Sequence, residues 1–189
     1  MLLQKTKIRN VYGMVTKRFL LLIALSLFTS VMFSQTITKK QVDEFTGAKI
    51  IETDWEKLVY SMKFTAYCRI RIVDDAHYFQ VRLMYGSVYS IPEDASIIFK
   101  LKDESTYQMK NRDYVISSRG GGAAGKLAGS EMQGTVCNYT NSGDINFSGL
   151  LESFPTKVRI YFRDSYIEND IKEKDAKIIQ EMIKLTKDL

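Results

Sequence analysis

The stretch that decides the fold is MKFTAYCRIRIVDDAHYFQVRLMY, residues 62 to 85. Apolar and polar residues alternate from Met62 to Ile72, which is the period of a strand with one buried face, and the alternation resumes in the opposite phase from His77 to Tyr85. A slip of one residue would expose one apolar set, so the register of this hairpin is well specified. A turn centred on Asp74 and Asp75 predicts these cross-strand pairs: Ile72 with His77, Ile70 with Phe79, Cys68 with Val81, and Ala66 with Leu83.

Further strands follow downstream of this hairpin. Residues 97 to 101 alternate, and a three-residue loop at residues 103 to 105 pairs Leu101 with Tyr107 and Phe99 with Met109. Strand character returns at residues 134 to 139 and at residues 157 to 163, and residues 147 to 154 can hold one helical turn.

The C-terminal segment changes to a helical period. Asp170 and Glu173 have the spacing of a capping box, and an apolar stripe follows at Ile171, Ile178, Ile179, Met182 and Ile183. Such a stripe needs a partner surface. We therefore predict an α+β fold, a mainly antiparallel β meander of about six to eight strands with a C-terminal helix packed on one face. The alternative is a β-sandwich with a peripheral helix.

The N-terminus has the pattern of a signal peptide. Its first 18 residues carry five basic residues and no acid, and an apolar run from Phe19 to Phe33 follows. That run is shorter than the roughly 20 residues of a spanning helix, so a retained anchor is the weaker alternative and we expect no membrane span after cleavage. Cleavage is expected after Ser34, and either Met1 or Met14 can be the start. We therefore expect a periplasmic or secreted protein with one domain at residues 35 to 189.

The net charge of the chain without its signal peptide argues against nucleic acid as a partner. The chain has 27 Lys and Arg, and removal of the five in the signal peptide leaves 22, which equals the 22 Asp and Glu. The basic isoelectric point thus comes from the export signal, and we expect no nucleic-acid binding. Cys68 and Cys137 remain in an exported chain, where they either form a disulfide or stay free.

A resemblance rests on Asp43 to Gly47 and on Thr53 and Trp55. An Asp-Glu-Phe-Thr-Gly segment soon after export, a Thr-x-Trp several residues later, a meander and a C-terminal helix resemble a family of uncharacterised exported proteins from the Bacteroidota. The resemblance implies export and this general architecture, and it implies no activity.

Two motifs fail as catalytic or metal sites. Gly120 to Lys126 has the glycine and lysine spacing of a phosphate-binding loop, but Leu127 stands where a hydroxyl must reach magnesium, so we interpret the segment as a loop. Asp74, Asp75 and His77 lie close together, yet one such cluster in a turn lacks the further ligands of a metal site. No nucleophile motif supports triad catalysis, and we expect no cofactor.

The outer face of the central hairpin is the candidate binding site, because its polar residues project together. The predicted contacts with a ligand are Tyr67, Arg69, Arg71, Tyr78, Gln80 and Arg82. Tyr67 opposite Arg82 and Arg71 opposite Tyr78 can stack as cation and ring pairs. The plainer interpretation is a solvated or covered sheet face. We expect a non-catalytic binding or structural module of the cell envelope, with a glycan or an envelope protein as partner. A hydrolytic enzyme with an unrecognised site and a lipid carrier are the alternatives.

Overall fold

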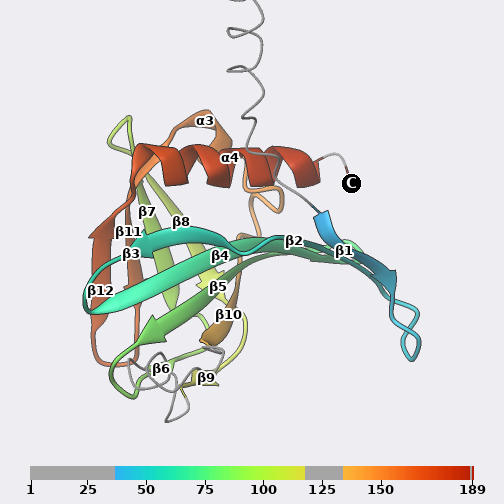
Figure 1. The fold of residues 1–189 in the computed structure, drawn as a ribbon, viewed down its shortest axis with the longest axis horizontal. Coiled ribbons are helices and arrows are strands. Elements are labelled where there is room, and N and C mark those ends of the chain that lie inside the picture. Colours follow the sequence, from blue (N-terminus) through green and yellow to red (C-terminus); the bar gives the residue numbers. More distant parts are fainter. Residues whose placement is uncertain (1–36, 118–133, 188) are drawn as a thin grey trace, which may run out of the picture. The chain divides into compact units, whose positions relative to one another are not determined.

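The structure is a computed structural model that describes residues 37–117, 134–187 and 189. It confirms the α+β fold, with a mostly antiparallel, open sheet and a C-terminal helix packed against it. Within the described residues, ten strands form one sheet and two short strands form a second (Figure 1). The strands of the first half are β1 (Ile37–Val42), β2 (Lys49–Thr53), β3 (Glu56–Tyr60), β4 (Phe64–Val73), β5 (Ala76–Tyr85), β6 (Ser90–Ile91) and β7 (Ser96–Leu101). The later elements are β8 (Thr106–Asn111), β9 (Val115–Ile116), β10 (Thr135–Thr140), α3 (Gly149–Glu152), β11 (Pro155–Tyr161), β12 (Tyr166–Asp170) and α4 (Glu173–Lys187).

The central hairpin has the predicted register. β4 and β5 pair over ten residues each, and all four predicted cross-strand pairs are present. Cys68, Ile70, Phe79 and Val81 are buried on the inner face. Met62 does not belong to this face, because β4 begins at Phe64 and the Met62 side chain lies fully in solvent.

The sheet is not a simple meander. Its order is β1-β2-β4-β5-β10-β8-β7-β11-β12, and β3 pairs with the part of β4 that β2 leaves free. β10 therefore lies between β5 and β8, although it follows both in the chain. Alternation in a single strand reports which face is buried, but it carries no information about which distant strand lies beside it.

The β7–β8 connection has the predicted loop length at a shifted position. Phe99 pairs with Tyr107 and Ile97 with Met109, so the predicted pairs are wrong by two residues. The loop lies before Ser105, whose carbonyl accepts from the Leu101 N–H, and Glu104 takes a positive φ of 69°. A shift of two residues preserves the period of a strand, so the buried face is still the predicted one.

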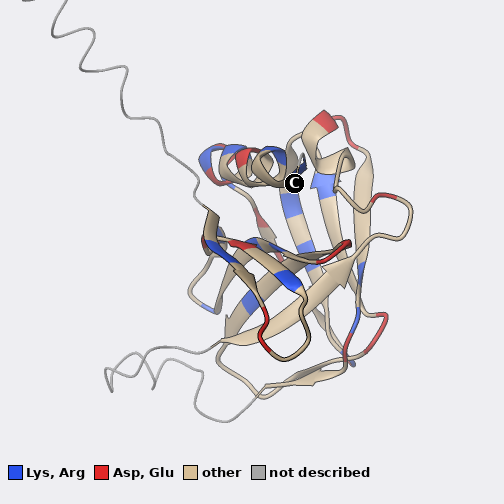
Figure 2. Ribbon diagram, turned by 90° about the vertical axis from the view of Figure 1, so that its right-hand side faces the viewer, with Lys and Arg blue, Asp and Glu red and all other residues tan. Residues whose placement is uncertain are grey.

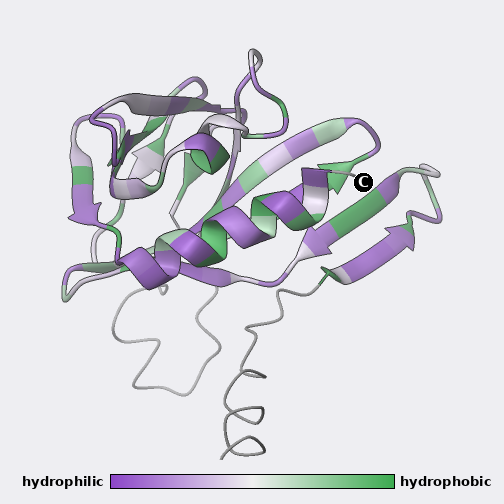
Figure 3. Ribbon diagram, turned by 90° about the horizontal axis from the view of Figure 1, so that it is seen from above, coloured by the Kyte–Doolittle hydropathy of each residue, from purple (hydrophilic) through white to green (hydrophobic). Residues whose placement is uncertain are grey.

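The sheet curves over its own inner face and encloses the core. Phe79 of β5 meets Phe99 of β7 edge to face at 5.7 Å between centroids, and it meets Phe147 in the same way at 5.9 Å. Helix α4 lies across one end of this core, as Figures 1 and 3 show, and it contacts β3, β4, β11 and α3. Ile179, Met182 and Ile183 of its predicted stripe are buried there.

The start of α4 differs from the predicted capping box. Asp170 ends β12, and the helix begins at Glu173, where the Lys172 carbonyl accepts from the N–H groups of Asp175 and Ala176. Asp175 in the first turn is buried and pairs with Lys57 of β3 at 3.5 Å. Packing against β3 therefore fixes the helix start, whereas the capping pattern considers only local sequence.

The two cysteines are free and buried, so the disulfide alternative is wrong. Val81 of β5 is the partner of Cys68 in β4 and of Cys137 in β10, so one strand separates the two thiols. Two strand spacings amount to about 9.6 Å between Cα atoms, beyond the roughly 7 Å that a disulfide allows. Burial raises the pKa of both thiols, that of Cys137 to about 12.

Thiol reactivity provides a direct check of this arrangement. We expect both cysteines to be silent toward a thiol reagent in the native, unreduced protein, because buried neutral thiols are poor nucleophiles. Both should react once the unreduced protein is denatured. Loss of the two thiols from the denatured sample would contradict the strand order around β5.

Two predicted segments lie outside the described residues: the signal peptide at 1–34, and the glycine-rich loop from Gly120 to Lys126. Among the described helices, none has the length and apolar character needed to cross a membrane.

Candidate functional site

The six predicted contact residues share one surface, which we call the outer face. Tyr67, Arg69 and Arg71 of β4 alternate with buried inner residues, and Tyr78, Gln80 and Arg82 do the same in β5. The register places Tyr67 opposite Arg82, Arg69 opposite Gln80 and Arg71 opposite Tyr78. Glu52 of β2, Trp55 of the β2–β3 connection and Asn138 of β10 extend this face on both sides.

The middle of the outer face is a polar relay that is largely closed to solvent. Arg69 donates from its two terminal nitrogens to the Glu52 carboxylate at 2.8 and 3.0 Å, and from Nε to Gln80 Oε1 at 2.6 Å. Gln80 Nε2 donates to Asn138 Oδ1 at 2.7 Å, and Asn138 Nδ2 donates to Asp113 at 3.0 Å. Gln80 is only 2% exposed and Glu52 only 7%. The relay therefore links four strands, and it reaches solvent at its Asp113 end.

Two of the predicted contact residues also have a structural role. Gln80 and the guanidinium of Arg69 form hydrogen bonds with their neighbours, so these side chains hold the face together. Burial lowers the pKa of Arg69, and the charge of Glu52 opposes that shift. The sequence places both residues on the outer face correctly, but alternation cannot show that polar neighbours cover them.

Trp55 is the aromatic centre of the outer face. The guanidinium carbons of Arg69 and Arg82 lie 4.5 and 4.1 Å from its ring centroid, so the ring partner of Arg82 is Trp55, not the predicted Tyr67. Gly134 lies against the aliphatic stem of Arg82, since a Cβ there would lie 2.8 Å from Arg82 Cγ. A larger residue at position 134 would therefore displace Arg82.

The arginines differ in their charge partners. Arg69 and Arg71 approach Glu52 at 2.8 and 3.4 Å, whereas Arg82 forms no ion pair with any described residue. The three arginines outnumber the two carboxylates of the relay, Glu52 and Asp113, by one. Elsewhere the charges are interspersed, as along α4 in Figure 2.

One strand of this face, β10, leads to a pocket. The β5–β10 ladder ends at the pair of Phe79 and Tyr139, and Thr140 is the next residue of β10. Thr140 in turn pairs with Lys110 of β8.

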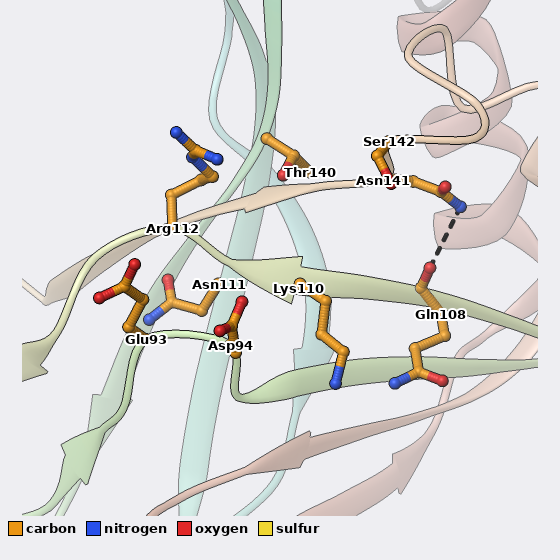
Figure 4. A pocket seen from close by; sticks show the side chains of 9 residues that line it. All are labelled: Glu93, Asp94, Gln108, Lys110, Asn111, Arg112, Thr140, Asn141 and Ser142. Carbon is orange, nitrogen blue, oxygen red and sulfur yellow. Dashed lines mark hydrogen bonds between the residues drawn. The ribbon is translucent and has the colours of Figure 1, made fainter.

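The pocket has a volume of about 360 Å³ and lies where β8 ends (Figure 4). Every residue that lines it is polar or charged: Glu93, Asp94, Gln108, Lys110, Asn111, Arg112, Thr140, Asn141 and Ser142. Asn111 secures the wall, because its Nδ2 donates to the carbonyls of Pro92 and Asp113. Its Oδ1 is buried and accepts no hydrogen bond within the described part of the chain.

Asp74 and Asp75 form the turn between β4 and β5, and His77 lies at the start of β5. Asp74 Oδ1 accepts from the Lys49 N–H at 2.8 Å, which ties β2 to this turn. His77 is partly covered opposite Ile72, and burial lowers its pKa against the opposing charge of Asp75. Groups of three or more potential His, Cys, Asp or Glu ligands do not occur in the described residues.

No known family profile, curated protein or solved structure matches this chain. The resemblance carried by Asp43 to Gly47, Thr53 and Trp55 therefore stays an expectation.

Sequence reasoning missed Glu52, Trp55, Asn138 and the pocket. Asn138 could have been placed, because Cys137 and Tyr139 are both buried and the strand residue between them must point outward. Glu52 and Trp55 flank the break between β2 and β3, where the period of two is lost. The pocket draws on the loop before β7, the end of β8 and the end of β10, and no local pattern connects them.

Proposed function

We propose that the protein is a non-catalytic binding module of the cell envelope that recognises an acidic glycan on its outer face. The observation that carries the proposal is Arg82, whose guanidinium lies 4.1 Å from the Trp55 ring centroid and forms no ion pair within the described residues. A guanidinium in this state offers paired N–H donors to a carboxylate or phosphate group. The positive excess of the outer face favours such a group.

The surroundings of Arg82 suit the rest of a sugar chain. Tyr67 and Tyr78 are half-exposed, and their rings combine an apolar face with a hydroxyl group. The pocket adds hydroxyl, amide and charged groups, and the unmatched Oδ1 of Asn111 beside it favours a ligand rich in donors. The relay beneath fixes the strands before binding, which lowers the entropic cost of recognition.

Titration with an acidic and a neutral polysaccharide tests this function. We expect the acidic polymer alone to bind, and we expect the double variant Arg71→Gln with Arg82→Gln to weaken binding by about tenfold or more, because charge-assisted bonds contribute roughly 1.5 to 3 kcal/mol each. Arg159→Gln is the matched control, since Arg159 is an exposed arginine of β11 that pairs with Glu168. Equal weakening by both variants, or no binding of the acidic polymer, would reject the proposal.

A hydrolytic enzyme is the competing function, because Glu93 and Asp94 both line the pocket. Both side chains are exposed. In a glycosidase, by contrast, burial usually raises the pKa of the carboxyl group that acts as the general acid. Release of reducing ends from the bound polysaccharide, abolished by Glu93→Gln or Asp94→Asn, would establish the enzyme in place of the binding module.

A further inference from the structure

The polar pocket at the end of β8 is bordered by four charged side chains that lack charged partners. Glu93 and Asp94 lie in the loop between β6 and β7. Lys110 and Arg112 lie where β8 ends. All four are exposed, and none of them forms an ion pair with any residue that the structure describes. Two negative and two positive charges therefore border one cavity without neutralising each other (Figure 4).

The backbone that carries these charges is fixed by hydrogen bonds. The Asp94 N–H donates to the Asn111 carbonyl at 2.9 Å, and the buried Asn111 side chain donates to the Pro92 carbonyl at 3.0 Å. The Arg112 N–H donates to the Asn138 carbonyl at 2.8 Å. The loop with the two acids and the strand end with the two bases thus keep their relative position, which lowers the entropic cost of binding a ligand between them.

The balance of charges favours a ligand that carries both signs. A purely anionic group would be attracted by the two basic side chains but repelled by the two acidic ones, and a purely cationic group would meet the reverse. A ligand with one ammonium and one carboxylate can form charge-assisted hydrogen bonds with both pairs. Since the four described side chains form no direct ion pairs with one another, the two charges of the ligand must also stand apart.

The rest of the lining suits a peptide group between those two charges. Thr140 and Ser142 contribute hydroxyl groups, and Asn141 contributes an amide. Hydroxyl and amide groups both donate and accept hydrogen bonds, as the N–H and the carbonyl of a peptide require. The volume of about 360 Å³ lies within the range of roughly 300 to 1,000 Å³ that is usual for small-molecule sites.

We propose that this pocket binds a short peptide as a zwitterion, with its ammonium at the two acidic side chains and its carboxylate at the two basic ones. Lys110 Nζ donates one hydrogen bond to Ser96 at 2.9 Å, and its two other N–H groups remain for the carboxylate. This site goes beyond the proposed function, because it does not use Arg82 and needs no glycan. Its charged side chains are exposed, so the binding is weak, with a dissociation constant of about a millimolar.

Calorimetric titration of the protein with diglycine and its two blocked forms tests the proposal. N-acetyl-diglycine lacks the ammonium, and diglycinamide lacks the carboxylate. We expect diglycine to bind and each blocked form to bind about tenfold or more weakly, because each has lost one set of charge-assisted hydrogen bonds. Absence of diglycine binding, or equal binding of the three peptides, would overturn the proposal.

Paired substitutions in the pocket assign the two ends of the ligand. Glu93→Gln with Asp94→Asn should weaken diglycine binding by about tenfold or more, but it should not weaken the binding of N-acetyl-diglycine, which has no ammonium to lose. Lys110→Gln with Arg112→Gln should have the corresponding effect, with diglycinamide as the insensitive ligand. Asparagine tolerates the φ of 64° at position 94, so the first variant keeps its backbone.

Glu44→Gln with Arg159→Gln is the matched control, because it removes one exposed acid and one exposed base outside the pocket. Diglycine should bind this variant as it binds the unmodified protein. An equal loss in the control and in the pocket variants would show that only the overall charge of the protein matters, and it would reject the site.

Discussion

Replacement of Arg69 by methionine should be among the most destabilising single changes on the surface of the sheet. The variant leaves the Glu52 carboxylate, which is only 7% exposed, without its closest cation, and removes the donor to Gln80. Loss of one partner of a buried ion pair costs roughly 3 to 5 kcal/mol, and Arg71, which stays 3.4 Å from Glu52, places the expected loss at the lower end of that range. Urea denaturation should show a lower midpoint with an unchanged slope.

A double variant isolates the reason for this loss. Glu52→Leu added to Arg69→Met removes the unpaired charge, so we expect it to recover a large part of the stability. Arg159→Met is the control for loss of an arginine at an exposed strand position, and it should have little effect. Additive losses in the double variant would show that the relay between Glu52 and Gln80 does not stabilise the sheet.

Replacement of Ile70 by aspartate should have a still larger effect. Ile70 has no exposed surface and faces Phe79 across the centre of the β4–β5 hairpin. Burial of an unpaired carboxylate there costs several kcal/mol, about half or more of a typical domain's stability, so we expect the variant to unfold or to lose most of its soluble yield.

The adjacent residue gives the comparison. Arg71→Gln lies on the opposite face of the same strand, where the Arg71 side chain is 34% exposed beside Glu52, and it should cost about 1 kcal/mol or less. Glutamine is preferable to aspartate here, since the Glu52 carboxylate lies 3.4 Å from Arg71. Ile70→Val keeps the fold measurable and should cost about 0.5 to 1.5 kcal/mol. Equal effects at residues 70 and 71 would reverse the assignment of the two faces.

The sequence predicts the short-range features of this fold. The alternation from Phe64 to Tyr85 determines which residues form strands, which face is buried and how the two strands pair, because any other pairing would bury charged residues or expose apolar ones. The position of β10 has no such signature, since β5 and β8 each present a backbone edge that accepts any strand.

The candidate site also has a part that the sequence predicts and a part that it does not. Alternation places Arg71, Tyr78 and Arg82 on one face, because successive side chains of a strand point to opposite faces of the sheet. It cannot reveal that Trp55 lies against Arg82 or that Asn138 closes over Gln80, because these contacts join residues far apart in the chain. Exposure of a strand face therefore depends on neighbours that only the tertiary structure provides.

The insertion of β10 between two earlier strands has a consequence for the order of assembly. Gln80 and Asn138 are bonded across 58 residues of sequence, so the edges of β5 and β8 stay open until the chain beyond them has been delivered. Contacts of such long range carry a large loop-closure entropy before they contribute any stability, which slows folding. During that interval the hairpin of β4 and β5 presents an unsatisfied edge to other chains. We therefore expect the joining of the two sheet halves to limit the folding rate, and we expect aggregation to be most favourable before it.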